Sequence, residues 1–519
     1  MKVTIMPNPK TLKRISGLFL LALTALYFSL TSGTIEGQGY NHENLVAANQ
    51  LVTNFVNVAT GQPLVRVDWT RHGFIEPIFQ LPFAFVSRAL FHDQMKWTGR
   101  LAIFQPMLAT ALLCTLLLWW TTRLTHSLRL GMLLAVCAGL GTMLWPYVYI
   151  GLETTQSLAL MLAAYLALGR EPTRTWPETW WFAVACAVAV AVKLNGIFLA
   201  PAIGFLILKY VNRSLRPGLR LICVLGVITT IYGLNWLAKA RYWSSMDGGT
   251  NYYGELLVDS PLTAALQAFA YFGSPNKSLL LFCPVLALSF ATMGKAWRSQ
   301  PQLVIFAWLT LGGLICGFSI TRMWTDETWG PRYLHAVVAP LLLCLAAAKS
   351  AQEFRWKREA LTLGLCALGA AISLLGSLFP YGWLHIAATR SSHATLEALQ
   401  YDPAWNHLRF NWQLLRVTVR GQAGGSTQPE AWPPPRHWWF SKPEDTPPEK
   451  TFDLRELALP QPMLLQGWRP NMGTSPLTFS VLRVICALSL VIGISGMGWL
   501  WRQAVLVDRN CESERRPLD

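Results

Sequence analysis

The chain has 519 residues, of which 53% are hydrophobic and only 13% charged, and its formal net charge is +16. Soluble domains carry about 25% charged residues, so this composition excludes an ordinary soluble protein. The basic charge does not indicate a nucleic-acid partner. The Lys and Arg residues lie in short segments between apolar runs, as the positive-inside rule describes for membrane proteins.

Apolar runs recur along the chain, and many are long enough to cross a hydrocarbon core of about 30 Å. They predict an all-α, polytopic helical membrane protein with about 12 transmembrane helices. Residues 179–208 can also be interpreted as one long kinked span with a re-entrant piece, which would put Lys193 inside the membrane. The predicted spans are roughly 16–31, 100–120, 130–150, 154–168, 179–193, 196–208, 219–238, 279–293, 303–320, 334–348, 361–379 and 479–501.

Basic residues predict the orientation of these spans. Lys10, Lys13 and Arg14 precede the first span without an acidic residue among them, which indicates a cytoplasmic N-terminus. Alternation then makes every predicted inner loop basic and puts the C-terminus inside as well. A signal peptide over 1–33 is the alternative, but no Ala-x-Ala-like cleavage site follows it.

Three regions are predicted on the outer side. The first, 33–99, holds an amphipathic helix over 41–59, followed by an apolar, proline-broken helix over 75–90 that is too short to span and suits the membrane interface. The second is 239–277, and the third, 381–478, is large enough for a partly ordered element. The expected organisation is a transmembrane core over 1–380, an outer segment over 381–478, and a last helix with an inner tail over 479–519.

The sequence gives little indication of a cofactor. Nine of the ten cysteines lie in apolar spans and the tenth lies in the inner tail, without CxxC spacing, so neither a disulfide framework nor a metal site is indicated. We expect no cofactor, and a divalent metal ion is not indicated. Asp326 and Glu327 have the chemistry to bind a metal or sugar hydroxyls, and they could equally pair with Arg322.

Acidic residues of the first outer loop are candidates for a general base, which accepts a proton from an attacking hydroxyl. Glu43 leads, because it opens the helix over 41–59 close to the first span, where a carboxylate also suits the positive helix terminus. The alternative is that Glu43 only caps this helix. Glu76 follows Arg71 and His72 and is a second catalytic candidate or a salt-bridge partner.

Cations at outer turns are candidates for binding a phosphate. Arg332 leads, because Gly330-Pro331 fixes a turn, Tyr333 suits the interfacial belt, and arginine binds phosphate oxygens with two parallel donors. The alternative is an arginine that only reaches from the apolar region to the interface. The other predicted substrate-binding residues are Arg71, His72, Lys277, Tyr333 and Asp326.

Four segments in this order carry a family resemblance: the helix from Glu43 to Ala59, Arg71-His72-Gly73-Phe74, 272–279 (FGSPNKSL), and 329–334 (WGPRYL). Over about 16–405 the chain resembles bacterial members of the GT-C glycosyltransferase superfamily, which includes protein O-mannosyltransferases and aminoarabinose transferases. The resemblance implies a polyprenyl-phosphate sugar donor and an acidic catalytic residue in the first outer loop. Many relatives have an Asp-containing pair where this chain has Asn41-His42-Glu43.

The expected function is a membrane glycosyltransferase in the bacterial inner membrane. It would move a sugar from a polyprenyl-phosphate donor to a glycan, lipid or protein acceptor on the outer face. The alternatives are a transporter or flippase of a lipid-linked saccharide and an inactive GT-C-like assembly factor. Transporters carry ionisable residues at mid-membrane and paired broken helices, whereas the ionisable candidate residues here lie near the predicted outer rim, with Lys193 as the exception.

Overall fold

The structure is a computed structural model of the full chain. It describes residues 8–31, 41–70, 72–91, 94–149, 151–169, 175–213, 216–244, 257–258, 260–321, 329–349, 356–379, 384, 387, 406–422, 431–432, 452–453 and 476–513. Helices make up nearly all of this part, and the two short strands form one small antiparallel pair. The predicted outer segment 381–478 is described only in part.

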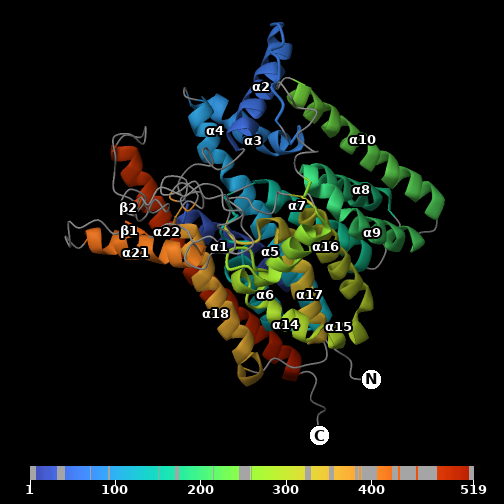
Figure 1. Ribbon diagram of the computed structural model, residues 1–519, viewed down its shortest axis with the longest axis vertical. Coiled ribbons are helices and arrows are strands. Elements are labelled where there is room, and N and C mark those ends of the chain that lie inside the picture. Colours follow the sequence, from blue (N-terminus) through green and yellow to red (C-terminus); the bar gives the residue numbers. More distant parts are fainter. Residues whose placement is uncertain are drawn as a thin grey trace.

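The N-terminal helices follow the predicted pattern closely. Helix α1 begins after Asn8, whose side chain accepts a hydrogen bond from the Lys10 backbone N–H at 2.9 Å, and Pro9 occupies its first turn. Both features favour a helix start. The two helices expected in the first outer loop are present and are well separated from α1 in Figure 1. The bounds are α1 (Pro9–Ser29), α2 (Asn41–Thr60), α3 (Ile75–Leu90) and α4 (Gln94–Ala102).

The middle of the chain contains helices that stop short of the predicted spans. The expected span 130–150 ends as a helix at Leu140, and turns follow over 141–149. Gly139, Gly141 and Pro146 explain the break, since glycine and proline disfavour helix interiors. The bounds are α5 (Phe104–Thr125), α6 (Leu128–Leu140), α7 (Gly151–Ala164), η1 (Tyr165–Gly169), α8 (Trp176–Ala191), η2 (Leu194–Leu199), α9 (Ala200–Asn212) and α10 (Pro217–Ser244).

The expected span 279–293 is also interrupted. Cys283 has φ −137° and ψ 66°, outside the helical region, and Pro284 follows it. The span is therefore divided between three short helices. The bounds in this half are α12 (Pro261–Gly273), α13 (Leu279–Phe282), α14 (Leu286–Ala291), α15 (Met293–Ser299), α16 (Pro301–Ser319), η4 (Arg332–Val337), α17 (Val338–Ala348), α18 (Trp356–Leu378), α21 (His407–Gln422), β1 (Ala431–Trp432), β2 (Phe452–Asp453) and α22 (Pro476–Ser513).

The long helices confirm a polytopic helical membrane fold. In the described part of the chain, six helices are long and apolar enough to cross a membrane, and shorter apolar helices accompany them. α10 and α22 leave most of their apolar surface outside the protein core, as helices facing lipid do. The six long helices are Pro9–Ser29, Trp97–Thr125, Pro217–Arg241, Pro301–Ser319, Glu359–Leu378 and Pro476–Arg509.

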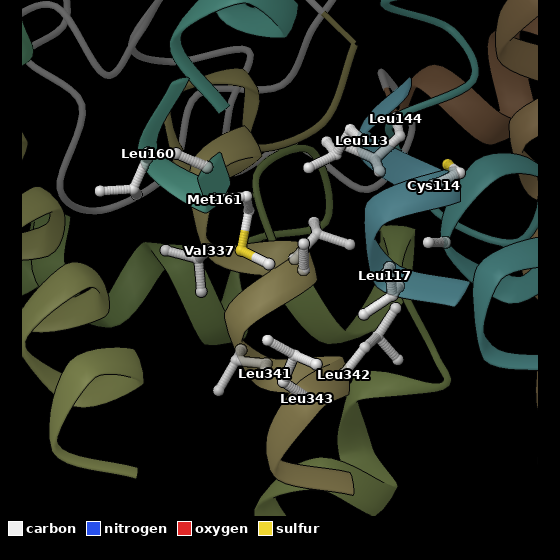
Figure 2. Close-up of a cluster of buried hydrophobic side chains, with 14 of the residues drawn as sticks. Leu113, Cys114, Leu117, Leu144, Leu160, Met161, Val337, Leu341, Leu342 and Leu343 are labelled. Carbon is white, nitrogen blue, oxygen red and sulfur yellow. The ribbon is translucent and has the colours of Figure 1, made fainter. Parts of the chain in front are cut away.

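The core of the bundle lies between α5, α7 and α17. Figure 2 shows Leu117 of α5, Met161 of α7 and Leu341 of α17 in one cluster of buried hydrophobic side chains. All three side chains are almost completely buried. In a bilayer, such close packing rather than water exclusion holds helices together, so these residues fix how α7 and α17 lie relative to each other.

The last helix is joined to the early part of the bundle. α22 packs along α1. Near the end of α22, the Asp508 carboxylate accepts hydrogen bonds from the backbone N–H of Leu128 at 2.9 Å and of Arg129 at 3.2 Å, and from Ser127 Oγ at 2.8 Å. Asp508 therefore caps the N-terminus of α6, where the first backbone N–H groups lack partners within the helix.

Candidate functional site

A buried ion cluster joins three segments that are distant in the sequence. Arg332 Nε donates to Glu153 Oε1 at 2.5 Å, and Lys193 Nζ donates to the same oxygen. The three side chains are at most 7% exposed. Ion pairs with so little solvent contact need good geometry to offset the cost of desolvating the charges. The fold therefore holds these three side chains in a defined arrangement.

Each member of the ion cluster lies where a helix starts or breaks. Glu153 is in the first turn of α7, and Lys193 is the residue that precedes η2. Arg332 begins η4 after Gly330, which has φ +56°, a left-handed conformation that glycine adopts without strain. Breaks between helices thus bring polar side chains together at one level of the bundle.

Aromatic and imidazole rings surround the ion cluster. Lys193 Nζ lies 4.6 Å from the centre of the Tyr333 ring, which stacks on Phe318 with ring centres 4.2 Å apart. His335 Nδ1 lies 2.6 Å from Ser157 Oγ. Among the described residues, His335 Nε2 and Glu153 Oε2 have no hydrogen-bond partner although both atoms are buried. Buried polar atoms without partners are uncommon and point to a further ligand or water.

Glu76 is the second buried carboxylate near this cluster. Thr155 Oγ1 donates to Glu76 Oε2 at 3.2 Å, and Gln105 Nε2 donates to Thr155 Oγ1 at 2.9 Å. Burial raises the pKa of the Glu76 carboxyl from 4.5 to about 7; the charge of Glu153 adds to this rise, while Thr155 and Gln105 oppose it. A carboxyl with this pKa can both accept and release a proton near neutral pH.

The helix start at Gly151 leaves room for the Glu76 carboxylate. A Cβ atom at Gly151 would collide with Glu76 Oε1 and would lie 2.9 Å from Gln105 Oε1. Glycine is therefore required here by close approach of a side chain and not by an unusual backbone angle. This contact sets how deeply the carboxylate reaches between α3 and α7.

Asn235 of α10 fastens the turn that leads into Glu76. Its Oδ1 accepts from the Phe74 backbone N–H at 2.8 Å, and its Nδ2 donates to the carbonyl oxygens of His72 at 3.2 Å and Ala191 at 2.6 Å. Ala191 is the last residue of α8, two residues before Lys193. One buried amide thus holds the segment before Glu76 against the segment before Lys193.

Glu43 lies in a separate surface cavity of about 590 Å³. The cavity forms between the start of α2, the segment 66–69 and the end of α10. Its lining carries both charge signs and one indole, and it includes neither Arg332 nor Lys277. The lining residues are His42, Glu43, Val46, Arg66, Val67, Asp68, Trp69 and Arg241.

Lys277 belongs to a neighbouring buried turn. Its side chain is 1% exposed, and its backbone N–H donates to Ser274 Oγ at 3.2 Å. The preceding residue joins this turn to α21, because Asn276 Oδ1 accepts a hydrogen bond from the His407 backbone N–H at 2.8 Å. The His407 ring lies 5.6 Å from that of Trp329. This turn and the turn before Arg332 therefore meet the same residue of α21.

The structure brings some of the predicted site residues together. Glu76, Arg332 and Tyr333 lie in or beside the ion cluster, and the backbone of His72 lies in the turn before Glu76. Glu43 is in its own cavity, and Lys277 lies in the neighbouring buried turn. Arg71 and Asp326 lie outside the described residues.

Sequence reasoning did not select Glu153, Lys193 or His335. A signal was present, since the predicted topology puts 151–153, 193–195 and the segment before 334 at outer turns on the same side as Glu76. Within the described residues, no group of three His, Cys, Asp or Glu side chains could hold a metal ion. The ion cluster and its surroundings supply two cations, two carboxylates and one imidazole.

Comparison with known proteins shows a likeness to a solved structure and none to a protein family. No protein-family model matches the chain, and no curated protein matches it. Among solved structures, it is similar to ArnT from Cupriavidus metallidurans in the apo state, with 14% sequence identity and a TM-score of 0.45, over 95% of this chain and 76% of ArnT. This degree of similarity assigns no activity, so the proposal below is built on the side chains of the site.

Proposed function

We propose that this protein is a membrane glycosyltransferase that moves a sugar from a polyprenyl phosphate to an acceptor at the outer face of the membrane. The observation that carries the proposal is the convergence of Arg332 and Lys193 on one buried carboxylate, Glu153, with Glu76 beside it. Two cations and one carboxylate give this trio a formal charge of +1. That sign suits the phosphate of a lipid carrier.

The charge of the ion cluster and its buried polar atoms without partners support a role in the departure of the phosphate. During transfer, the bond between the sugar's anomeric carbon and the phosphate oxygen breaks, and the phosphate leaves with the bonding electrons. Arg332 and Lys193 would stabilise this developing charge, as cations aimed at a leaving phosphate do. Glu153 would hold both cations in position, and His335, whose Nε2 has no partner among the described residues, would face the same ligand.

Two carboxylates are candidates for the base that accepts the proton of the acceptor hydroxyl. Glu76 is buried near Glu153, the carboxylate that holds both cations, and its pKa of about 7 suits proton transfer near neutral pH. Glu43 lines an open cavity in the first outer loop, where an acceptor has access. We favour Glu76 as the base, because it lies beside the groups that would hold the phosphate, and we retain Glu43 as the alternative.

Binding of the carrier lipid tests the phosphate role without knowledge of the sugar. The probe is polyprenyl phosphate added to the purified protein in nanodiscs, with Lys209→Ala on α9 as the control for a cation outside the cluster. Losing one charge-assisted hydrogen bond costs roughly 1.5–3 kcal/mol, so Arg332→Lys, which keeps the charge and loses the fork, should weaken binding about tenfold or more. Unchanged binding by a folded Arg332→Lys and a folded Lys193→Gln protein would contradict the proposal.

Two isosteric variants decide between the bases. Loss of a general base lowers a rate by about 10²–10⁴-fold, and glutamine keeps the shape of glutamate. The variant that binds polyprenyl phosphate normally but transfers no sugar, Glu76→Gln or Glu43→Gln, identifies the base. If both variants turn over normally, neither carboxylate is the base.

A second candidate is a transporter of a lipid-linked saccharide, which one observation favours. The helices break at the ion cluster, with η2 after Lys193 and η4 at Arg332, and transporters build their sites from such discontinuous helices. Liposomes that contain the protein and a fluorescent polyprenyl-phosphate saccharide test this candidate. Movement of the lipid between leaflets without any sugar transfer would support the transporter over the enzyme.

A further inference from the structure

Helix α21, residues His407–Gln422, has a second apolar stripe that faces away from the protein. One face carries Phe410 and Leu414 and is buried. The opposite face carries Trp412 and Val419, which are 54% and 56% exposed. Leu415 is partly exposed beside them, since positions 412, 415 and 419 recur at helical spacing, whereas Leu408 at the start of the helix packs against the core.

Arginines follow this stripe along one side. Arg409, Arg416 and Arg420 repeat at the same spacing, one position further around the helix, and residues 406–422 contain no aspartate or glutamate. Arg409 and Arg420 are exposed, and Arg416 is partly exposed. An apolar stripe beside a cationic stripe is the pattern of a helix that lies in a membrane interface, with its apolar side in the acyl chains and its cations at the lipid phosphates.

The position of α21 agrees with this pattern. Asn411 Nδ2 donates to the carbonyl oxygen of Leu375 at 3.1 Å. Leu375 lies three residues before the end of α18, one of the helices able to cross a membrane, which is about 4.5 Å along the helix axis. Figure 1 shows α21 crossing the end of α18 at a steep angle. The helix is therefore at the level where a spanning helix leaves the hydrocarbon.

We propose that α21 is an interfacial helix that binds anionic phospholipid headgroups of the leaflet in which α18 ends. The occupant of its outward face is the bilayer surface. Two observations support this choice: the arginines of α21 complement anionic headgroups, and the helix lies at the level where α18 ends. The proposal does not depend on the glycosyltransferase activity, although His407 at the start of α21 contacts both site turns.

Photocrosslinking tests the proposal. The photoreactive residue p-benzoylphenylalanine replaces Trp412 in the full-length protein, which is reconstituted in nanodiscs with equal parts of phosphatidylglycerol and phosphatidylcholine. Lipid adducts are identified by mass. The same residue at Val491, exposed on α22, is the positive control, and at Gln413, about 100° around α21, it is the control for the polar side.

We expect adducts at position 412 as at 491, fewer at 413, and an excess of phosphatidylglycerol at 412. Each arginine near an anionic surface contributes up to about a fivefold preference. The triple variant Arg409→Gln, Arg416→Gln, Arg420→Gln should lower the excess to the bulk ratio while phosphatidylcholine adducts persist. Three results would overturn the proposal: no lipid adduct at 412 while 491 reacts, a crosslink from 412 to another protein chain, or a bulk lipid ratio at 412 in the unmodified arginine background.

Discussion

Arg332 and Glu153 are 179 positions apart in the chain, yet Arg332 Nε lies 2.5 Å from Glu153 Oε1 inside the protein. Each is located in the first turn of its helical segment, α7 or η4. The pair ties the start of α7 to the start of η4, and Lys193 brings the α8–η2 break to the same point. Three helix starts or breaks are thus held by a single carboxylate.

Replacing only one partner of the Arg332–Glu153 pair should destabilise the protein more than replacing both. Glu153→Gln leaves Arg332 and Lys193 buried without their carboxylate, and loss of one partner of a buried ion pair costs about 3–5 kcal/mol. The double variant Glu153→Gln, Arg332→Gln should recover part of this loss. Thermal unfolding of the purified proteins measures the stability of both variants. A double variant that is no more stable than Glu153→Gln would show that the two side chains are not coupled.

The close contact at Gly151 gives a second prediction. Gly151→Ala should displace the Glu76 carboxylate and cost about 1–3 kcal/mol of stability, the usual cost of overpacking. Gly364→Ala in α18 is the matched control, because a Cβ atom there meets nothing within 4 Å. We expect the control to be neutral or slightly stabilising in thermal unfolding, since alanine favours helices over glycine. Equal stability of the two variants would remove the steric role of Gly151.

Glu76 predicts a pH dependence with a defined sign. Its pKa is raised in the folded protein from 4.5 to about 7, so between these values the folded state binds more protons than the unfolded state. The free energy of unfolding should therefore fall as the pH rises from about 4.5 to about 7, by on the order of 3 kcal/mol. Glu76→Gln should flatten this fall in thermal unfolding measured across pH. If the substitution leaves the pH profile of stability unchanged, the pKa of the Glu76 carboxyl is not raised in the folded protein.

Asn235 predicts a positioning effect on the site. Asn235→Leu leaves the His72 carbonyl and the Phe74 N–H without the Asn235 amide, at about 1–3 kcal/mol for each buried unsatisfied group, whereas the Ala191 carbonyl keeps its hydrogen bond from Lys239. Asn212→Leu at the exposed end of α9 is the control. We expect reduced stability and, in the folded fraction, weaker binding of polyprenyl phosphate than in the control. Normal binding with reduced stability would limit Asn235 to a structural role.

Much of the fold could be predicted because it depends on local patterns. The helices expected over 41–59 and 75–90 appear as α2 and α3, since their apolar spacing and turn residues lie within the helices themselves. The interruptions after Leu140 and at Cys283 were missed because apolar composition alone does not reveal where a span breaks. Prolines and glycines in both segments carried that information.

The sequence predicts which side of the membrane the site residues share, but not which of them are in contact. Alternating spans bring Glu76 and Arg332 to one face, but nothing local pairs Glu153 with Arg332 or with Lys193. That pairing depends on how α7, α8 and η4 pack together, which cannot be inferred from the local patterns of a single sequence. The orientation, the domain organisation and the catalytic role of Glu43 stay predictions.

The cap that Asp508 supplies to α6 has a consequence for the order of assembly. Ser127 and Asp508 are separated by 381 positions, so almost the whole chain is synthesised before the backbone N–H groups of Leu128 and Arg129 receive their acceptor. Until then, the start of α6 has only its local cap, in which Ser127 Oγ accepts from the Leu130 N–H. Removing Asp508 would therefore weaken a helix start that lies 380 positions earlier in the chain.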